Sequence, residues 1–307
     1  MSKRWIDNQG VEFDRNEGLG ASEVAAVLGY DPYITPYKIW AIKTGRLDPD
    51  EENAAMKAGT RHQPTVLAYY NDGPGRGGWM YDVPITYREA NPRLWATPDA
   101  IDFAQGRIVE LKTTEVYNKD EWAEDAPIRH RVQCQIQRYA IQPKPWHPDP
   151  LDTTVTLAVL IGLSDYREYE IPYDEEWATS SVEYVIDWWQ RHVVADVPPD
   201  VTPADIETFR RLHPDDTGEV IEADEELASM IEQLAGVRRE LSSLKRDENE
   251  LKRLIEARVQ DATYVRTGAG ALRMGWKERK GYEVAPTRDR EFTILDDEKA
   301  GKELGDV

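Results

Sequence analysis

The stretch TPDAIDFAQGRIVELKTT, residues 97–114, decides the fold class of the chain. Residues 99–103 and 107–113 are strand-like, and Gln105 and Gly106 between them mark a turn. Runs of this length joined by a short turn usually pair with each other. The stretch therefore predicts two adjacent strands of a sheet.

Two acidic residues and a lysine make this strand pair a candidate active site. Alternate residues of a strand face opposite sides, so Glu110 and Lys112 share one face. Val109 and Leu111 then point the other way, into a core. If the strands are adjacent, Asp99 and Glu110 meet at one end of the sheet. Glu110 and Lys112 are either a surface ion pair, which contributes little stability, or half of an active site.

The chemistry that such a group supports is hydrolysis of a phosphodiester with a metal ion. Two carboxylates and a backbone carbonyl, here that of Leu111, form a typical oxygen site for Mg²⁺. Lys112 on the same face would orient a metal-bound water or help to deprotonate it. The spacing alone is a weak signal, because acidic chains contain many such matches.

Helices surround the predicted strands along the sequence. The predicted helices cover 22–28, 35–45, 56–70, 128–141 and 174–193. Further strand-like runs cover 79–89, 94–104, 155–163 and 166–173. This order predicts an α/β or α+β fold with a mixed central sheet flanked by helices.

The C-terminal third has a different pattern. We expect a core domain over 1–195, a linker over 196–220 and a C-terminal region over 221–307 that contains a long helix or helical hairpin followed by a β-hairpin. A heptad pattern of apolar residues supports the helix. One position of the heptad holds Leu227, Leu234, Leu241 and Ile255, interrupted by Glu248, and the other holds Met230, Val237, Leu244 and Leu251.

Composition limits the classes of function. The 307 residues are 40% hydrophobic and 31% charged, enough for a large core, and the net charge is -20. That charge argues against non-specific coating of DNA or anionic membranes, but it permits a local basic groove. The single cysteine, Cys134, excludes an intramolecular disulfide and Cys-rich metal sites. No apolar signal segment or membrane-spanning run is visible, so we expect a cytosolic protein.

Four segments in order give a more specific signal. They are 15–45, 59–70, the segment with Asp99, Glu110 and Lys112, and 130–141. Together they resemble the YqaJ-like viral recombinase group, to which phage lambda exonuclease belongs, within the PD-(D/E)xK nuclease superfamily. The resemblance covers about the first half of the chain and implies a PD-(D/E)xK, restriction-endonuclease-like core.

The resemblance also implies roles for individual residues. Asp99, Glu110 and the Leu111 carbonyl would bind catalytic metal, and Lys112 would assist the attacking water. A glutamine of the helix after this strand lines the family's site. Gln133 matches it best, Gln135 lies beside it, and Gln137 one turn beyond is a weaker candidate. The implied cofactor is Mg²⁺, with Mn²⁺ as a substitute, in two bound ions.

One position departs from the family. The helix in GTRHQPTVLAYY, residues 59–70, supplies an acidic residue in the family, but here Gln63 occupies that position. Glutamine has the shape of glutamate without its charge and is a poorer metal ligand, which puts the second metal in doubt. Gln63 is a tolerated natural variation, a change introduced to trap a substrate complex, or the mark of a weak nuclease that mainly binds DNA ends. His62 beside it is expected on the surface.

The N-terminal segment suggests a site for an anion. Ser22 is predicted to cap a helix whose free N–H groups favour an anion, and Gly20 permits close approach of the backbone. Arg15 upstream offers a planar fork to a phosphate. The family resemblance implies that Arg15 and Ser22 hold a DNA 5′-phosphate. The alternative is an ordinary capped helix with a solvated arginine.

The sequence therefore leads to one main hypothesis and two alternatives. The first is a metal-dependent 5′-to-3′ exonuclease on double-stranded DNA ends, acting in phage-type homologous recombination in the cytoplasm of a bacterial host. The second is a weakened, end-binding protein of the same fold, suggested by Gln63. The third is an acidic DNA mimic, against which the four ordered segments argue. The resemblance further implies a homotrimeric ring around DNA and a single-strand annealing protein as partner.

Overall fold

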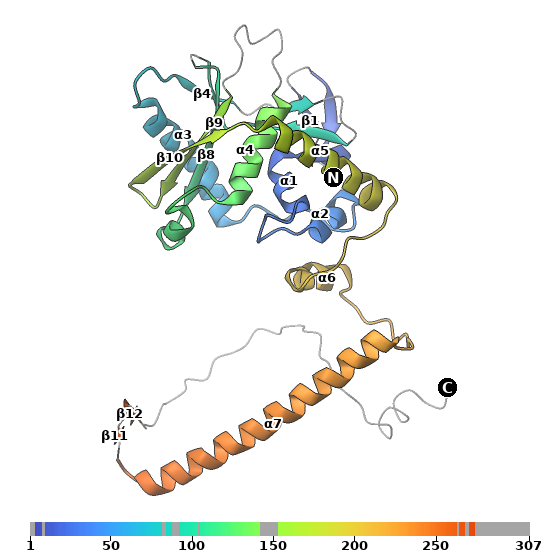
Figure 1. Ribbon diagram of the computed structural model, residues 1–307, viewed down its shortest axis with the longest axis vertical. Helices are drawn as coiled ribbons and strands as arrows, with labels where there is room; N and C mark the ends of the chain where they lie inside the picture. The colour runs from blue at the N-terminus through green and yellow to red at the C-terminus, as the bar shows by residue number, and fades with distance from the viewer. Residues whose placement is uncertain are drawn as a thin grey trace. The chain divides into compact units, whose positions relative to one another are not determined.

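The computed structural model describes most of the chain in two compact units, Met1–Asp216 and Thr217–Val307. The described residues are 4–7, 10–81, 84–87, 92–103, 105–141, 153–262, 264–267 and 270–273. Figure 1 shows the sheet and its helices in the first unit and the long helix of the second. Each unit is described by itself below.

A mixed five-stranded sheet forms the centre of the first unit, in the order β10-β9-β8-β7-β4. Strands β8 and β9 are parallel, and the other neighbouring pairs are antiparallel. The bounds are β4 Gly78–Met80, β7 Ala100–Asp102, β8 Arg107–Thr114, β9 Thr154–Ile161 and β10 Asp165–Pro172. The predicted strand pair is therefore β7 and β8, and the expected α/β fold with a mixed central sheet is confirmed.

Two smaller sheets accompany the central one. Strand β3 pairs in parallel with β6, which pairs antiparallel with β5. Strands β1 and β2 form an antiparallel pair close to the N-terminus. The bounds are β1 Arg4–Ile6, β2 Glu12–Asp14, β3 Gly18–Gly20, β5 Ile85–Tyr87 and β6 Arg93–Ala96, with a 3-10 turn, η1, at Arg15–Glu17.

Helices cover both faces of the central sheet, as Figure 1 shows for α3 and α4. Val66 and Tyr70 of α3 pack against Val109 and Leu111 of β8, as expected from their alternation along the strand. On the other face Cys134 of α4 packs on β9. The helices are α1 Ala21–Val27, α2 Pro36–Lys43, α3 Ala54–Asn71, α4 Ile128–Ala140 and α5 Glu175–Trp189. Helix α5 continues into a π-turn, η3 Gln190–Val194, and a 3-10 segment, η2 Val116–Trp122, follows β8.

The sequence correctly predicted the residue that caps the start of α2, but not the residue that caps the start of α1. Thr35 caps α2 by accepting a hydrogen bond from the Lys38 backbone, as predicted. Helix α1 begins one residue earlier than expected, with Gly20 as N-cap, so the prediction that Ser22 caps it is wrong. At this start the Gly20 N–H donates to the Glu23 carboxylate, and a Cβ at residue 20 would lie 2.6 Å from the Trp95 ring. Close packing on Trp95 thus requires glycine where the helix begins.

The first unit continues past residue 195, where we expected the core to end. A 3-10 turn, η4 Pro203–Asp205, leads into α6 Ile206–Leu212. Asp205 is fully buried, accepts hydrogen bonds from Thr202 and contacts the Thr35 hydroxyl. Phe209 and Leu212 pack on the helical core. The boundary between the units, at Asp216, falls inside the predicted linker of 196–220.

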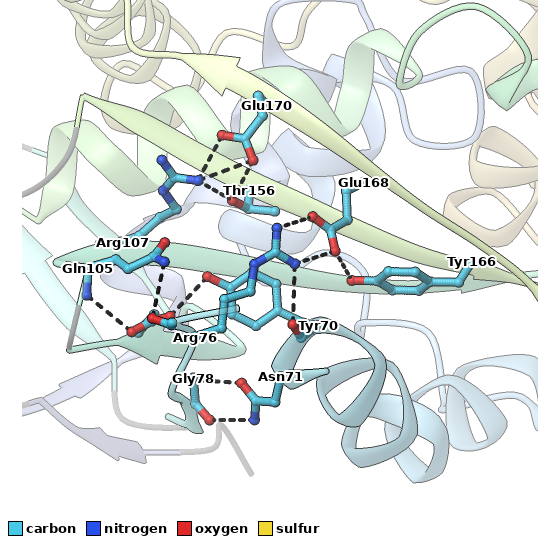
Figure 2. Close-up of polar contacts among 12 residues, drawn as sticks. Tyr70, Asn71, Arg76, Gly78, Gln105, Arg107, Thr156, Tyr166, Glu168 and Glu170 are labelled. Carbon is cyan, nitrogen blue, oxygen red and sulfur yellow. Dashed lines mark hydrogen bonds and ion pairs between the residues drawn. The ribbon is translucent and has the colours of Figure 1, made fainter. Parts of the chain in front are cut away.

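A polar network joins the end of α3 to strands of the central sheet, and Figure 2 shows most of its members. Asp102 accepts hydrogen bonds from the Tyr70 hydroxyl and from the backbone of Gly77 and Gln105. Nearby, Arg76 forms a two-pronged ion pair with Glu168 of β10. Asp102 is fully buried, so these partners are what make a carboxylate tolerable there.

The described part of the second unit is a helix and a hairpin. Helix α7, Glu225–Val259, runs without a break, so the sequence alternative of a helical hairpin is wrong. Strands β11 Tyr264–Thr267 and β12 Gly270–Arg273 form the predicted hairpin, and the remainder of the expected hairpin region lies outside the described residues. Among the described residues, no helix combines the length and the apolar character needed to cross a membrane.

Candidate active site

The side chain of Glu110 lies at the centre of the candidate site. In β8 it shares a face with Ile108 and Lys112, and Ile108 packs with Cys134 of α4. This face therefore lies beneath α4. Glu110 is fully buried. A buried carboxylate needs hydrogen-bond donors or cations around it. Without them, the loss of its hydration costs on the order of several kcal/mol of free energy.

Three side chains supply those donors. Lys112 donates to Oε1 of Glu110 from the same strand. Gln133 of α4 donates to Oε1 at 2.6 Å, and Gln137 one turn later donates to Oε2 at 2.5 Å. Packing of α4 against β8 thus places two amides on one carboxylate. Gln135, the neighbour considered in the sequence, points away and bonds the Pro172 carbonyl instead.

Asp99 lies at the end of β7, next to Glu110. Its Oδ2 accepts the backbone N–H of Leu111 at 2.9 Å. Its Oδ1 accepts the side-chain amide of Gln63 at 2.7 Å. The carboxyl group of Asp99 lies close enough to that of Glu110 for the charge of Glu110 to raise the pKa of Asp99. Gln63 reaches this end of the sheet from α3, on the face opposite to α4.

The two carboxyl groups change each other's proton affinity. Burial, with the charge of Glu110, raises the pKa of Asp99 to about 7. Burial alone would lower the pKa of Lys112, but the charges of Glu110 and Asp99 outweigh it and raise that pKa. Lys112 is therefore a cation at neutral pH, and the pair of Asp99 and Glu110 holds a proton more readily than two separate carboxyl groups would.

The Leu111 carbonyl is directed toward the same place. The Leu111 N–H points at Asp99, and a strand residue directs its N–H and C=O to the same side. The pairing of β7 with β8 ends at Ala100 and Val109, so β7 offers no strand partner opposite Leu111. This carbonyl is thus available as a third oxygen beside the two carboxylates.

The donor set fits a divalent cation. Each carboxylate oxygen has two lone pairs, and Oδ1, Oδ2 and Oε2 each accept a single hydrogen bond from the contacts above. One lone pair on each of these oxygens therefore remains for a cation. A cation there would also relieve the repulsion that raises the pKa of Asp99. Two carboxylates and a carbonyl are oxygen ligands that suit Mg²⁺ or Mn²⁺.

The site has fewer acidic groups than a full metal cluster would have. Within the described ranges, no group of three or more His, Cys, Asp and Glu side chains is arranged to hold a metal ion. Gln63, which donates to Asp99, contributes a neutral amide to the site and no carboxylate. His62 beside it is exposed, as expected, and belongs to the solvent-facing side of α3.

Gln137 is the residue that sequence reasoning undervalued. It is fully buried, and its amide oxygen has no hydrogen-bond partner among the described residues. The only sequence signal was its spacing of one helical turn from Gln133. That spacing was enough to place both amides on one face, but not to show which of them is buried.

Arg15 and Ser22 lie in the N-terminal part of the unit. The Arg15 guanidinium lies 4.9 Å from the Trp5 ring and 5.1 Å from the Trp95 ring. Its N–H groups donate no hydrogen bond within the part of the chain that the structure describes, while its backbone carbonyl accepts one from buried Lys43. Ser22 is exposed in the first turn of α1. The arginine is thus held by stacking with its donor edge unused.

The comparison with known sequences identifies a domain. Residues 12–142 match the family model of the YqaJ-like viral recombinase domain, which confirms the resemblance inferred from the sequence. The uncharacterized protein YqaJ of Bacillus subtilis (strain 168) is 27% identical over 187 residues, 61% of this chain and 56% of that protein. The alignment therefore spans little more than half the length of this curated relative.

Solved structures were also matched, and two of them are described here. The alkaline exonuclease LHK-Exo from Laribacter hongkongensis, in complex with dAMP, gives a TM-score of 0.49 at 18% identity over 65% of this chain and 95% of that chain. A phage-related exonuclease from Haemophilus somnus 129PT gives a TM-score of 0.42 at 11% identity over 59% of this chain and 96% of that chain.

Proposed function

We propose that this chain, whose residues 12–142 match the YqaJ-like viral recombinase domain, is a metal-dependent exonuclease on double-stranded DNA ends. The reaction is hydrolysis of a phosphodiester in the 5′-to-3′ direction, in phage-type homologous recombination. The observation that carries the proposal is the proximity of the Asp99 and Glu110 carboxyl groups. These are two carboxyl groups from neighbouring strands, surrounded by a lysine and three amides.

The cation in this proposal is Mg²⁺, for which Mn²⁺ would substitute. Asp99, Glu110 and the Leu111 carbonyl would hold it. When bound, it would neutralise charge on the phosphate and increase the acidity of a bound water. Gln63 offers only a neutral amide to a second cation, so the proposal includes one firmly held ion and a weaker second position.

Three residues of the chain hold the Glu110 carboxylate in place and supply a positive charge beside it. Gln133 and Gln137 fix the Glu110 carboxylate from both oxygens, so the group needs no reorganisation when a substrate binds. Lys112 holds its proton on Nζ, because Glu110 and Asp99 raise its pKa. We assign to this ammonium group a hydrogen bond to the attacking water or to a phosphate oxygen.

Recognition of a 5′-phosphate is assigned to Arg15 and Ser22. An arginine stacked on aromatic rings presents a preordered fork of N–H donors, which suits a phosphate oxygen pair. The exposed Ser22 hydroxyl would add a further donor. This contact would favour the 5′-to-3′ direction, because the phosphorylated strand would be held at its end.

A second function is favoured by Gln63. Its amide nitrogen, rather than a carboxylate oxygen, faces Asp99. A site with one carboxylate fewer binds cations more weakly, and the chain would then mainly bind DNA ends and cleave slowly. Rotation of the Gln63 amide would present its oxygen, a neutral ligand, to a cation beside Asp99.

The test is digestion of a linear duplex that carries a 5′-phosphate on one strand. The exonuclease proposal expects loss of that strand with Mg²⁺, no loss with EDTA, and no loss with Asp99→Asn. Arg15→Gln should remove the preference for the phosphorylated strand while cleavage continues. Retained binding of the duplex without cleavage supports the end-binding function, and absence of both binding and cleavage contradicts both functions.

Assembly is a further part of the proposal. The family resemblance implies a homotrimeric ring around DNA and a single-strand annealing protein as partner. A ring would reconcile DNA binding with the net charge of -20, because acidic surfaces could face outward. Mass measurement of the full chain with and without duplex DNA tests the trimer.

A further inference from the structure

Helix α7 carries an apolar seam that is left open. None of its residues is buried against the described part of the chain. The seam follows the two heptad positions a and d, and Leu241 and Leu244 at its middle are 60% and 57% exposed. Its members are Leu227, Met230, Leu234, Val237, Leu241, Leu244, Leu251 and Ile255. A seam of this kind, repeated every seven residues, is typical of a coiled coil.

Charges of opposite sign follow the two sides of this seam. One flank, heptad position e, carries Arg238, Lys245 and Lys252. The other flank, position g, carries Glu240 and Asp247. In a coiled coil these flanks contact the partner helix and set both its identity and its direction.

The charge pattern is complementary to itself in a single orientation. In a parallel, in-register pair, position g of one helix faces position e five residues later in the other. Glu240 then meets Lys245 of the second copy, and Asp247 meets Lys252 of the second copy. An antiparallel pair would instead place acidic flank against acidic flank and basic against basic, which is repulsive.

We propose that α7 forms a parallel, in-register coiled coil with α7 of a second copy of this chain. The association buries the seam, and the flanks select a like helix in the parallel direction. Glu248 stands at position a inside the seam, where a charged residue costs stability and disfavours slipped registers. The proposal concerns the second unit and does not depend on the nuclease function.

The first test uses two charge-reversal variants of the full chain in sedimentation analysis. Glu240→Lys with Asp247→Lys makes both flanks basic, and Lys245→Glu with Lys252→Glu makes acidic the two e positions that face Glu240 and Asp247 of the second copy. Each variant alone should self-associate at least about tenfold more weakly, because attractive pairs become repulsive. An equimolar mixture of the two variants should restore association, since each basic flank then faces an acidic one.

A matched control separates pairing from net charge. Arg239→Glu with Arg246→Glu changes the charge by the same amount as the acidic variant, but both positions face away from the seam. This control should associate like the unchanged chain. Glu248→Leu should tighten association, because it replaces the charge inside the seam. Metal-dependent digestion of duplex DNA is measured alongside, so that a loss of pairing and a loss of nuclease activity are recorded separately.

The direction of pairing is tested by a cross-link. Met230→Cys places a thiol at a d position, where a parallel pair brings it next to its own copy, so oxidation should link two chains. The native Cys134 is buried and does not compete. Self-association that ignores both charge variants, a mixture that fails to recover, or absence of the Met230→Cys link would each overturn the proposal. If the chain assembles only through its first unit, both charge variants will associate like the unchanged chain, and this result also overturns the proposal.

Discussion

The amide of Gln63 donates a hydrogen bond to Oδ1 of Asp99 at 2.7 Å and so joins α3 to the end of β7. This contact makes position 63 part of the candidate site, although its side chain carries no charge. It also satisfies one oxygen of Asp99 in the absence of a cation. The same contact therefore places a neutral amide, and no third carboxylate, beside Asp99.

Replacement of Asp99 by asparagine is expected to reduce the cleavage rate at least about a hundredfold. Loss of one group that stabilises charge in a transition state usually has an effect of this size. The control is Asp102→Asn on the same strand, a fully buried carboxylate whose partners are Tyr70, Gly77 and Gln105. It should lower thermal stability while the folded fraction cleaves normally. Single-turnover digestion and thermal melts measure the two effects, and a similar loss of cleavage in both variants would contradict the assignment.

Gln63→Glu is expected to increase cleavage and cation affinity. The added carboxylate raises the pKa of Asp99 further in the metal-free state, because two like charges then face it. Melting temperature should therefore fall without metal and rise more steeply with added Mg²⁺ than in the unchanged chain. Gln135→Glu is the matched control, since Gln135 bonds Pro172 rather than the site. Equal responses of the two variants would show that position 63 does not contact the cation.

Gln137→Met is expected to slow cleavage by about 10- to 100-fold, the usual effect of losing a group that orients a metal ligand. Its amide holds the buried Oε2 of Glu110, and methionine retains the volume but not the donor. Cation affinity should fall with the rate, whereas Gln135→Met should change neither. Titration of Mn²⁺ by calorimetry measures affinity. Unchanged affinity with a lower melting temperature would mean that Gln137 acts only on stability.

Cation binding is expected to tighten as the pH rises through about 7. Burial and Glu110 raise the pKa of Asp99 to about 7, so a proton occupies the carboxyl that the cation needs below that pH. Binding at pH 6.5 should release protons, and binding at pH 9 should not. Calorimetry in buffers of different ionisation enthalpy measures the released protons. Equal affinities at pH 6 and pH 8 would contradict a role for Asp99.

The same pKa fixes the sign of a stability effect in metal-free protein. Asp99 binds its proton more tightly when folded than its ordinary pKa of 3.8 allows when unfolded. Its contribution to the free energy of unfolding is therefore fully present below about pH 4 and is lost as the pH rises to about 7. In the Asp99→Asn variant, which cannot ionise at this position, the free energy of unfolding should lose this dependence on pH. The difference in unfolding free energy between the two chains, measured at pH 5 and pH 8, checks it.

Local patterns in the sequence determined much of the frame. Alternation along residues 107–113 correctly separated Glu110 from Val109, because neighbouring side chains of a strand must face opposite sides. Thr35 before Pro36 marked the start of α2, since capping needs only adjacent residues. The heptad pattern over 227–255 predicted α7, because the spacing of apolar residues along a helix is also a local property of the sequence. The order of motifs also sufficed to identify the YqaJ-like domain.

Tertiary structure alone decided the composition of the site. Gln63 and Asp99 are 36 positions apart, and Gln137 and Glu110 are 27 apart. Their contacts depend on how α3 and α4 pack on the sheet, which no local pattern specifies. The N-cap of α1 is Gly20 and not Ser22, and Trp95, 75 positions away, leaves no room for a side chain at that residue. The sequence by itself therefore determined which elements form and which acidic residues they carry, since periodicity and capping are local. Only long-range packing decided which amides and aromatic rings surround those residues.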